Sequence, residues 1–482
     1  MKRQLLIALC ILVTANWSPV TVKAQINTDR MILIGRNALY LEDYVMAIQH
    51  FNQVIKAKPY LAEPYLYRAI AKYSLDDFKG AENDLTLCLE RNSFLPQAYW
   101  CRGASRQNRG DFENAIADYS KGLKFLPEDK QMLLNQAIAY AQTKDYDAAL
   151  QNLDLLVKYH PNFPQSYMAR GSVYGEKGDT AQAFANYDKA LALDKNYAPV
   201  YAQRAILYLQ QEMYTQALMD CNRAILLEPD RAGYYINRGL ARYHLNDLRG
   251  AMADYDKVLT MDAHNQIAQF NRGLLRAQVG DTHGAIDDFN RVLEWDSENY
   301  MAMYNLSLLH KELGNLKESR AYLEKVVAEY PNSILAATQT EVKVDKTKKT
   351  REKSDKNISK FNRLVVYDAD EEQKSKYADE LRGRVQDREV KIDLEPPFAD
   401  ADDEKLPFNR AYALNQQKDH PAAIAAYTEA IQVNPEFAKA YYNRGLTYLY
   451  IGENDLGIAD LSKAGELGLI NAYSVIKKMA AE

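Results

Sequence analysis

The residues best suited to chemistry in this sequence are six asparagines that recur at one register of a repeating pattern. They are Asn135, Asn237, Asn271, Asn305, Asn409 and Asn443. An amide carries a donor and an acceptor together, so it can pair with a peptide group whatever side chain that group bears. Asparagine is a poor helix former, which favours a binding role over polar residues that merely cover a helix surface. Lys405 and Lys439 stand four residues before the last two, one helical turn away.

Motifs for catalysis are absent from the sequence. It contains no GxxxxGK[ST], HExxH, GxSxG, CxxC or dinucleotide-type glycine loop. Its seven histidines occupy unrelated positions in the pattern and share no helix face, so neither a metal nor another cofactor is predicted. The acidic runs at 287–288 and 402–404 lack the spacing of calcium loops. We therefore predict a binding protein and not an enzyme.

Residues 1–24 have the features of a cleavable signal peptide. Lys2 and Arg3 precede an apolar run at 5–13, which is shorter than the roughly 20 residues that a membrane span needs. Cys10 lies in this run without the preceding glycine or alanine of a lipoprotein anchor. We expect a periplasmic or secreted protein with no membrane insertion after cleavage. A buried N-terminal helix is the alternative.

Charge and cysteine content narrow the class of protein further. A formal net charge of −5 argues against a generic nucleic-acid binder, which would present a basic face. Cys88, Cys101 and Cys221, which follow the signal segment, match neither a disulfide framework nor a zinc spacing. A Cys88–Cys101 bridge stays open, because sequence alone does not give the distance between the two residues.

A period of 34 residues runs through 28–333 without an insertion or a deletion. One small residue marks each segment: Gly35, Ala69, Gly103, Ala137, Gly171, Ala205, Gly239, Gly273 and Ser307. A second small residue follows twelve positions later and a large one four positions beyond that. Two antiparallel helices pack closely only where side chains are small, so these positions mark a helix crossing.

Aspartates between the two small positions are predicted to begin each second helix. There they can accept hydrogen bonds from free backbone N–H groups and complement the helix dipole. They are Asp43, Asp77, Asp111, Asp145, Asp179, Asp247 and Asp281.

This pattern resembles the tetratricopeptide repeat in its period, its small–small–large spacing and its terminal prolines. The resemblance covers 28–333 as nine repeats and returns in 405–482 as two further repeats and a capping helix. It implies an all-α fold, a right-handed superhelical solenoid of about eleven helix–turn–helix repeats. It also implies that the first helices line a concave groove in which the inner asparagines hold the backbone of an extended peptide. Lysine plus asparagine is similar to half of a carboxylate clamp, so a terminal carboxylate is a further candidate ligand.

The chain departs from that family pattern by placing arginine just before the small residue. Six of these arginines have an aspartate sixteen residues later: Arg68, Arg102, Arg204, Arg238, Arg272 and Arg444. Because each arginine occurs with its own aspartate, we predict a structural ion pair between the two helices of a hairpin and not an anion site. Arg170 and Arg410 lack this aspartate and are predicted to be freer to meet a ligand.

Residues 334–404 interrupt the period. A charged tether at 341–360 leads into apolar stretches at 362–367 and 385–394, which we expect to pair as strands, with a turn at Pro396-Pro397. The small α/β insert resembles a segment of exported tetratricopeptide proteins from Bacteroidetes. Whether it only bridges two blocks or has a function stays open.

These features predict a protein–protein interaction scaffold in the cell envelope. It would bind an extended or helical segment of a protein or peptide partner in the concave groove. A binding module for a glycan or cell-wall polymer is one alternative. A regulatory subunit that acts through the insert is another. The oligomeric state is left open.

Overall fold

The described residues of the computed structural model are 27–329, 394–398 and 405–481. They form 23 α-helices and no strand. The predicted all-α repeat fold is therefore confirmed. The segments predicted as signal peptide, tether and paired strands lie outside the described residues, apart from the last few residues of the insert.

The helices fall into two compact units. Unit 1 combines residues 27–139 with 394–398 and 405–481, and unit 2 is 140–329. The helices of unit 1 are α2 (Thr28–Tyr40), α3 (Tyr44–Ala57), α4 (Glu63–Ser74), α5 (Phe78–Arg91), α6 (Pro96–Asn108), α7 (Phe112–Phe125), α8 (Lys130–Gln142, at the division), α23 (Leu406–Gln416), α24 (His420–Val433), α25 (Ala438–Tyr450), α26 (Asn454–Glu466) and α27 (Asn471–Ala481).

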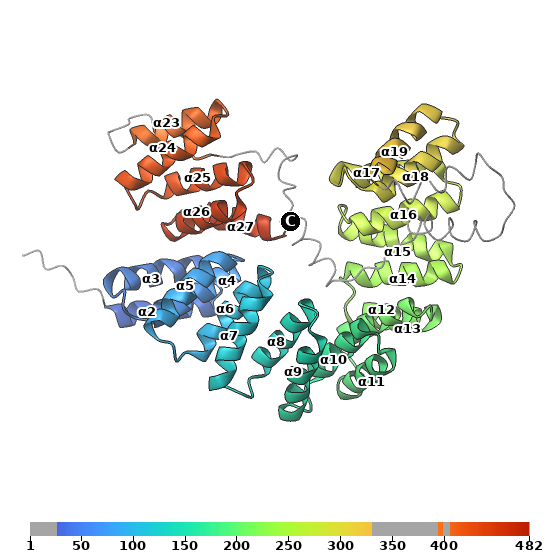
Figure 1. Ribbon diagram of the computed structural model, residues 1–482, viewed down its shortest axis with the longest axis horizontal. Helices are drawn as coiled ribbons and strands as arrows, with labels where there is room; N and C mark the ends of the chain where they lie inside the picture. Colours follow the sequence, from blue (N-terminus) through green and yellow to red (C-terminus); the bar gives the residue numbers. More distant parts are fainter. Residues whose placement is uncertain (1–26, 330–393, 399–404, 482) are drawn as a thin grey trace, which may run out of the picture. The chain divides into compact units, whose positions relative to one another are not determined.

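Unit 2 is built from antiparallel helix pairs that stack in chain order, as the pairs from α14 to α19 show (Figure 1). Its helices are α9 (Tyr146–Tyr159), α10 (Pro164–Lys177), α11 (Thr180–Leu193), α12 (Ala198–Gln210), α13 (Tyr214–Leu227), α14 (Ala232–His244), α15 (Leu248–Met261), α16 (Gln266–Gln278), α17 (Thr282–Trp295), α18 (Tyr300–Glu312) and α19 (Leu316–Glu329).

Seven of the second helices begin where the sequence predicts. All seven predicted aspartates accept a hydrogen bond from the backbone N–H three residues later, which confirms them as N-caps. In α3, for example, the N–H of Met46 donates to Asp43 Oδ1 at 3.0 Å. Asp419 caps α24 in the same way.

The helix crossings also follow the predicted small–large pattern. A methyl group added to Gly103 would lie 2.7 Å from Cε1 of Tyr119, and one added to Gly171 would lie 2.7 Å from Cε1 of Tyr187. Both rings are buried. The large residue of each hairpin therefore occupies the space that a side chain on the first helix would need.

All six predicted arginine–aspartate pairs are present, and in each the guanidinium donates two hydrogen bonds to the carboxylate. The third guanidinium nitrogen reaches back to a side chain of the preceding hairpin, sixteen residues earlier. Arg204, for instance, binds Asp220 ahead and Asp188 behind. Each arginine thus joins the two helices of its own hairpin and ties that hairpin to its neighbour.

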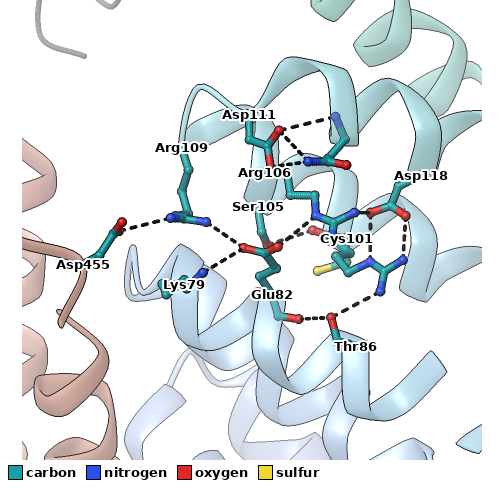
Figure 2. Close-up of polar contacts among 12 residues, drawn as sticks. Lys79, Glu82, Thr86, Cys101, Ser105, Arg106, Arg109, Asp111, Asp118 and Asp455 are labelled. Carbon is teal, nitrogen blue, oxygen red and sulfur yellow. Dashed lines mark hydrogen bonds and ion pairs between the residues drawn. The ribbon is translucent and has the colours of Figure 1, made fainter. Parts of the chain in front are cut away.

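A second cation, one helical turn after four of these arginines, binds the same aspartate. These cations are Lys72, Arg106, Arg242 and Arg276. Figure 2 shows Arg106 between Asp118, at 2.7 Å, and Glu82 of the preceding hairpin, at 2.9 Å. Arg109 donates to the same Glu82 at 2.7 Å and to Asp455 at 3.2 Å (Figure 2). Each of these buried aspartates is therefore held by two cations from the first helix of its own hairpin, and Arg106 also ties its hairpin to Glu82 of the preceding one.

Arg170 is less free than its sequence suggested. Its guanidinium donates to Asn186 at 2.7 Å and to Asp154 at 2.8 Å. It therefore occupies the same structural position as the six paired arginines, with an amide in place of the carboxylate. Arg410 differs, because its side chain is 57% exposed and pairs with the half-exposed Glu429.

Unit 1 joins the end of the chain to its beginning. Glu466, at the end of α26, pairs with Lys72 of α4 and lies 3.9 Å from Arg68. Lys72 is 1% exposed and also lies 2.9 Å from Asp84. The cluster therefore holds two cations and two carboxylates in a buried setting. Close by, Ser462 of α26 donates to Asp77 of α5.

An apolar cluster accompanies this charged one. It includes Ala38 and Phe51 from the first hairpin and Leu449 and Leu461 from the α25–α26 hairpin. Helix α27, in the stretch predicted to cap the array, adds Ala472, Tyr473 and Ile476 to the same cluster. The first and last hairpins of unit 1 thus share one core.

The three cysteines in the described part of the chain are buried and free, so Cys88 and Cys101 form no bridge. Burial raises the pKa of Cys88 to about 11 and the pKa of Cys101 and of Cys221 to about 12. These thiols are therefore protonated at neutral pH and serve as packing groups.

Candidate peptide-binding site

Two of the predicted asparagines hold a segment of the chain itself. Asn443, on α25, accepts a hydrogen bond from the N–H of Glu395 at 2.8 Å and donates to its carbonyl oxygen at 2.9 Å. Asn409, on α23, makes the same two bonds with Phe398, both at 2.8 Å. Each amide therefore satisfies both polar backbone groups of one residue.

We call Lys405, Asn409, Lys439 and Asn443 the C-terminal clamp. The two asparagines occupy equivalent positions on the first helices of neighbouring hairpins, 34 residues apart. Asn443 is buried, and its amide also donates to the hydroxyl of Tyr427 at 3.3 Å. That second bond fixes the orientation of the amide, which is what pairing with a peptide group requires.

The side chains of the bound segment meet the rest of the clamp. Lys439 Nζ pairs with a carboxylate oxygen of Glu395 at 2.9 Å. The ring of Phe398 lies 5.5 Å from Phe408, with the ammonium groups of Lys439 and Lys405 5.3 and 5.5 Å from its centroid. Aromatic packing and cation–π attraction therefore act on the same ring. The carboxylate that the clamp holds belongs to a side chain within the chain and not to a terminus.

The spacing of the two contacts matches the geometry of an extended proline-rich chain. Proline fixes its own φ and pushes the preceding residue toward the extended region, so Glu395 and Pro396 are both held extended. Such a chain rises about 3.1 Å per residue with three residues per turn, so three residues span about 9 Å. That is comparable to the roughly 8–10 Å between packed helices. One asparagine per hairpin can therefore meet every third residue.

From 395 to 398, burial and hydrogen bonding mark the same two residues. Glu395 and Phe398 are half-buried, whereas Pro396 and Pro397 between them are exposed. Proline has no N–H, so Glu395 and Phe398 carry the only two backbone donors from 395 to 398. Both donors are bound by the clamp.

The structure places the other predicted asparagines in two settings. Asn237, Asn271 and Asn305 lie on the successive first helices α14, α16 and α18 of unit 2, with exposures of 2%, 0% and 5%. Asn135 is half-buried on α8, and its amide bonds the hydroxyl of Tyr119. It is isolated, because the same register holds Cys101 in the preceding hairpin and Ala169 in the following one.

The segment that this site holds, 394–398, was not predicted from the sequence. We predicted a turn at Pro396-Pro397, but no turn or bend is present across Leu394–Phe398. The available signal was two prolines between an acidic and an aromatic residue, a composition that favours an extended chain over a turn when a binding surface is close by. Leu394 also packs against the shared core of unit 1 and is not part of a strand.

Metal and membrane features are absent from the parts of the chain that the structure describes. No three or more histidine, cysteine, aspartate or glutamate residues there are grouped so that they could hold a metal ion. None of the helices described has the length and apolar character that crossing a bilayer requires.

Family models identify the repeats. Models described as tetratricopeptide repeat match 102–166, 164–197, 203–270, 276–341 and 438–467, and one described as TPR repeat matches 411–452. Together they cover more than half of the chain. The chain belongs to the tetratricopeptide repeat family. Tetratricopeptide repeats form a scaffold fold that generally mediates contacts between proteins.

Individual relatives match only part of this tetratricopeptide repeat protein. Hsp70-Hsp90 organizing protein 1 from Glycine max is 39% identical over 74 residues, which are 15% of this chain and 12% of that protein. A tetratricopeptide repeat protein from Parabacteroides merdae is 21% identical over 54% of this chain and 98% of its own, with a TM-score of 0.41. YrrB, described as having an unusual peptide-binding site, is 21% identical over 39% of this chain and 97% of its own, with a TM-score of 0.34.

Proposed function

We propose that this protein is an exported scaffold of the cell envelope that holds an extended segment of a partner protein through its inner asparagines. The observation that carries the proposal is the pairing of Asn409 and Asn443 with both backbone groups of one residue each. Recognition of this kind tolerates different side chains, which suits a scaffold. Residues 1–24, with their basic start and short apolar run, support export.

We expect unit 2 to offer a longer version of the same arrangement, in which the amide of Asn305 exchanges its bond to the carbonyl oxygen of Met301 for one to the ligand. Asn237, Asn271 and Asn305 repeat the register of Asn409 and Asn443 over three successive hairpins. By the three-residue spacing seen at the C-terminal clamp, they would engage residues i, i+3 and i+6 of one extended segment. Four residues before these asparagines the chain has Gly233, Ile267 and Met301 in place of lysine. This face should therefore be less selective for acidic segments.

The proposal predicts that replacing the three asparagines of unit 2 by alanine strongly weakens the binding of extended peptides. The full-length protein, with and without Asn237→Ala/Asn271→Ala/Asn305→Ala, would be incubated with a pooled library of unstructured peptides, and the retained fraction measured. We expect at least tenfold less retained peptide, because the substitutions remove three amides that would each donate to and accept from the same peptide backbone. Asn135→Ala is the matched control, since this isolated asparagine has no partner at the same register next to it.

Equal retention by the triple variant and the wild type would contradict the proposal. A parallel incubation with insoluble peptidoglycan separates the alternative function. Retention of the protein on that polymer, undiminished by excess peptide, would assign the chain to the glycan-binding class instead.

A further inference from the structure

We infer that the C-terminal clamp recognises a segment with the order acidic–Pro–Pro–aromatic, that 394–398 is its internal copy, and that a partner protein binds by displacing this copy with a segment of the same kind. The inference rests on the proposed function, because it assigns a ligand class to one of the asparagine surfaces. It goes further in giving that surface a sequence preference and a resident competitor.

The acidic position is specified by Lys439. Its ammonium group lies 2.9 Å from the carboxylate of Glu395, and Asn443 holds the backbone of the same residue. A neutral residue would lose this pair, and a basic one would face the ammonium group of Lys439. In unit 2 the equivalent positions carry no charge, so the acidic preference belongs to the C-terminal clamp alone.

The aromatic position is specified by two rings and two ammonium groups. Phe398 packs against Phe408 at 5.5 Å and Phe437 at 5.8 Å. The ammonium groups of Lys405 and Lys439 lie within 5.5 Å of its ring centroid, and only an aromatic side chain can make this cation–π contact.

The two prolines between these positions act on the backbone. They are exposed, so they contribute little contact of their own. They hold the chain extended with the three-residue repeat that presents the flanking residues to the same side, and they lower the entropy lost on binding. They also leave no unpaired N–H between the two clamped residues.

The internal copy is a strong competitor because of its position in the chain. Only residues 399–404 separate Phe398 from Lys405, the first residue of the clamp. A tether this short gives an effective concentration on the order of millimolar. An external segment of equal intrinsic affinity therefore binds weakly unless the internal one is released.

The test uses a fluorescent peptide with the sequence of residues 392–400, IDLEPPFAD, and the full-length protein. Its dissociation constant is measured for wild type and for Glu395→Lys/Phe398→Ala, which disables the internal copy and leaves the clamp intact. We expect the peptide to bind the variant at least tenfold more tightly than wild type. Adding Asn409→Ala/Asn443→Ala should remove that gain, and a scrambled peptide should bind neither form.

A charge exchange protects the test against variants that merely misfold. A peptide with lysine in place of its glutamate should bind the Glu395→Lys/Phe398→Ala protein at least tenfold more weakly than the original peptide. Lys439→Glu, combined with Glu395→Gln/Phe398→Ala so that the internal segment carries no charge at position 395, should restore its binding and weaken the original peptide. Recovery of binding by a second substitution requires a folded clamp.

Equal affinity of the peptide for wild type and Glu395→Lys/Phe398→Ala, or equal binding of the scrambled peptide, would overturn the inference. If the peptide binds no form while pooled peptides still require Asn237, Asn271 and Asn305, only the ligand class assigned to the C-terminal clamp is wrong. If both binding reactions are absent, the proposed function is wrong as well.

Discussion

Replacing Glu466 by alanine is expected to cost unit 1 about 3–5 kcal/mol of folding free energy, because it leaves a buried cation without its counter-charge. In the wild type, Lys72 and Arg68 share the carboxylates of Asp84 and Glu466. Without Glu466 the cluster carries a net positive charge in a site where Lys72 is 1% exposed. Hydrogen exchange of the amides in α4, α5 and α26 measures the change in unit 1 separately from unit 2.

Asp455→Ala is the matched control for this prediction. Asp455 also lies on α26 and also pairs with an arginine of the N-terminal hairpins, Arg109 at 3.2 Å, but its carboxylate is 82% exposed. We expect a change within about 0.5 kcal/mol, as for other exposed pairs. Equal effects of the two substitutions would show that the buried cluster is not what joins the two ends of the chain.

The pH dependence of the Glu466 effect has a definite sign. Burial by itself would raise the pKa of Glu466, but the positive charges of Lys72, Arg68 and Lys463 hold that pKa well below its usual range. A carboxyl with a depressed folded-state pKa stabilises fully above its unfolded pKa, about 4.3, and loses that contribution only as the pH falls below it. The stability difference between wild type and Glu466→Ala should therefore be constant down to about pH 5 and shrink below about pH 4.

Replacing Arg204 by methionine is expected to destabilise unit 2 by about 3 kcal/mol, because Asp220 loses the guanidinium that binds it. Arg204 donates to both carboxylate oxygens of Asp220, at 2.7 and 2.8 Å, and Asp220 is buried. Hydrogen exchange in α12 and α13 would report the loss. Adding Asp220→Leu should recover most of it, since an apolar pair leaves no buried charge.

Arg410→Met is the control for Arg204→Met. Both arginines stand at the same position of the repeat, but Arg410 is largely exposed and pairs with a half-exposed glutamate. Its loss should change stability by less than about 0.5 kcal/mol. A comparable cost at the two sites would contradict the view that burial of the aspartate makes the pair structural.

Titration adds a second check on Arg204. Burial raises the pKa of Asp220 even with Arg204 beside it. In Arg204→Met the folded protein should take up a proton at Asp220 more readily still, so folding becomes more favourable as the pH falls. The loss of stability caused by Arg204→Met should therefore be larger at pH 7 than at pH 5.

Local features of the fold were predictable from the sequence because they depend on residues within one hairpin. The spacing of small and large residues predicts where the two helices of a hairpin cross, as at Gly103 and Tyr119. The interval of sixteen residues gave the pairing of Arg204 with Asp220, and aspartates such as Asp43 gave the helix starts. The reason is that a 34-residue period samples the same local contacts many times.

Contacts between distant parts of the chain were not predictable in the same way. Lys72 and Glu466 are separated by 394 residues, and neither breaks the local pattern of its helix. The second cation of each shared aspartate did have a signal, a basic residue four positions after the arginine, as in Arg102 and Arg106. The sixteen-residue interval alone does not reveal it, because the second cation reaches the same carboxylate from the next turn of the helix.

Only the clamp residues of the candidate site were predictable from the sequence. The repeat register selected Asn409, Asn443, Lys405 and Lys439, but the segment that they hold lies in a non-repeating insert. A pair of prolines fits either a turn or an extended ligand, and only the opposing surface decides between them.

The central claim, that paired asparagines clamp an extended backbone at every third residue, is tested most directly by exchange of two amide protons. Between 395 and 398 only Glu395 and Phe398 have backbone N–H groups, so a fragment of this segment reports the clamp alone. We predict that in the full-length protein both protons exchange at least a hundredfold more slowly than in the free peptide, and that Asn409→Ala/Asn443→Ala returns them to the free rate. Free-peptide exchange in the wild type, or protection that survives the double substitution, would contradict the account.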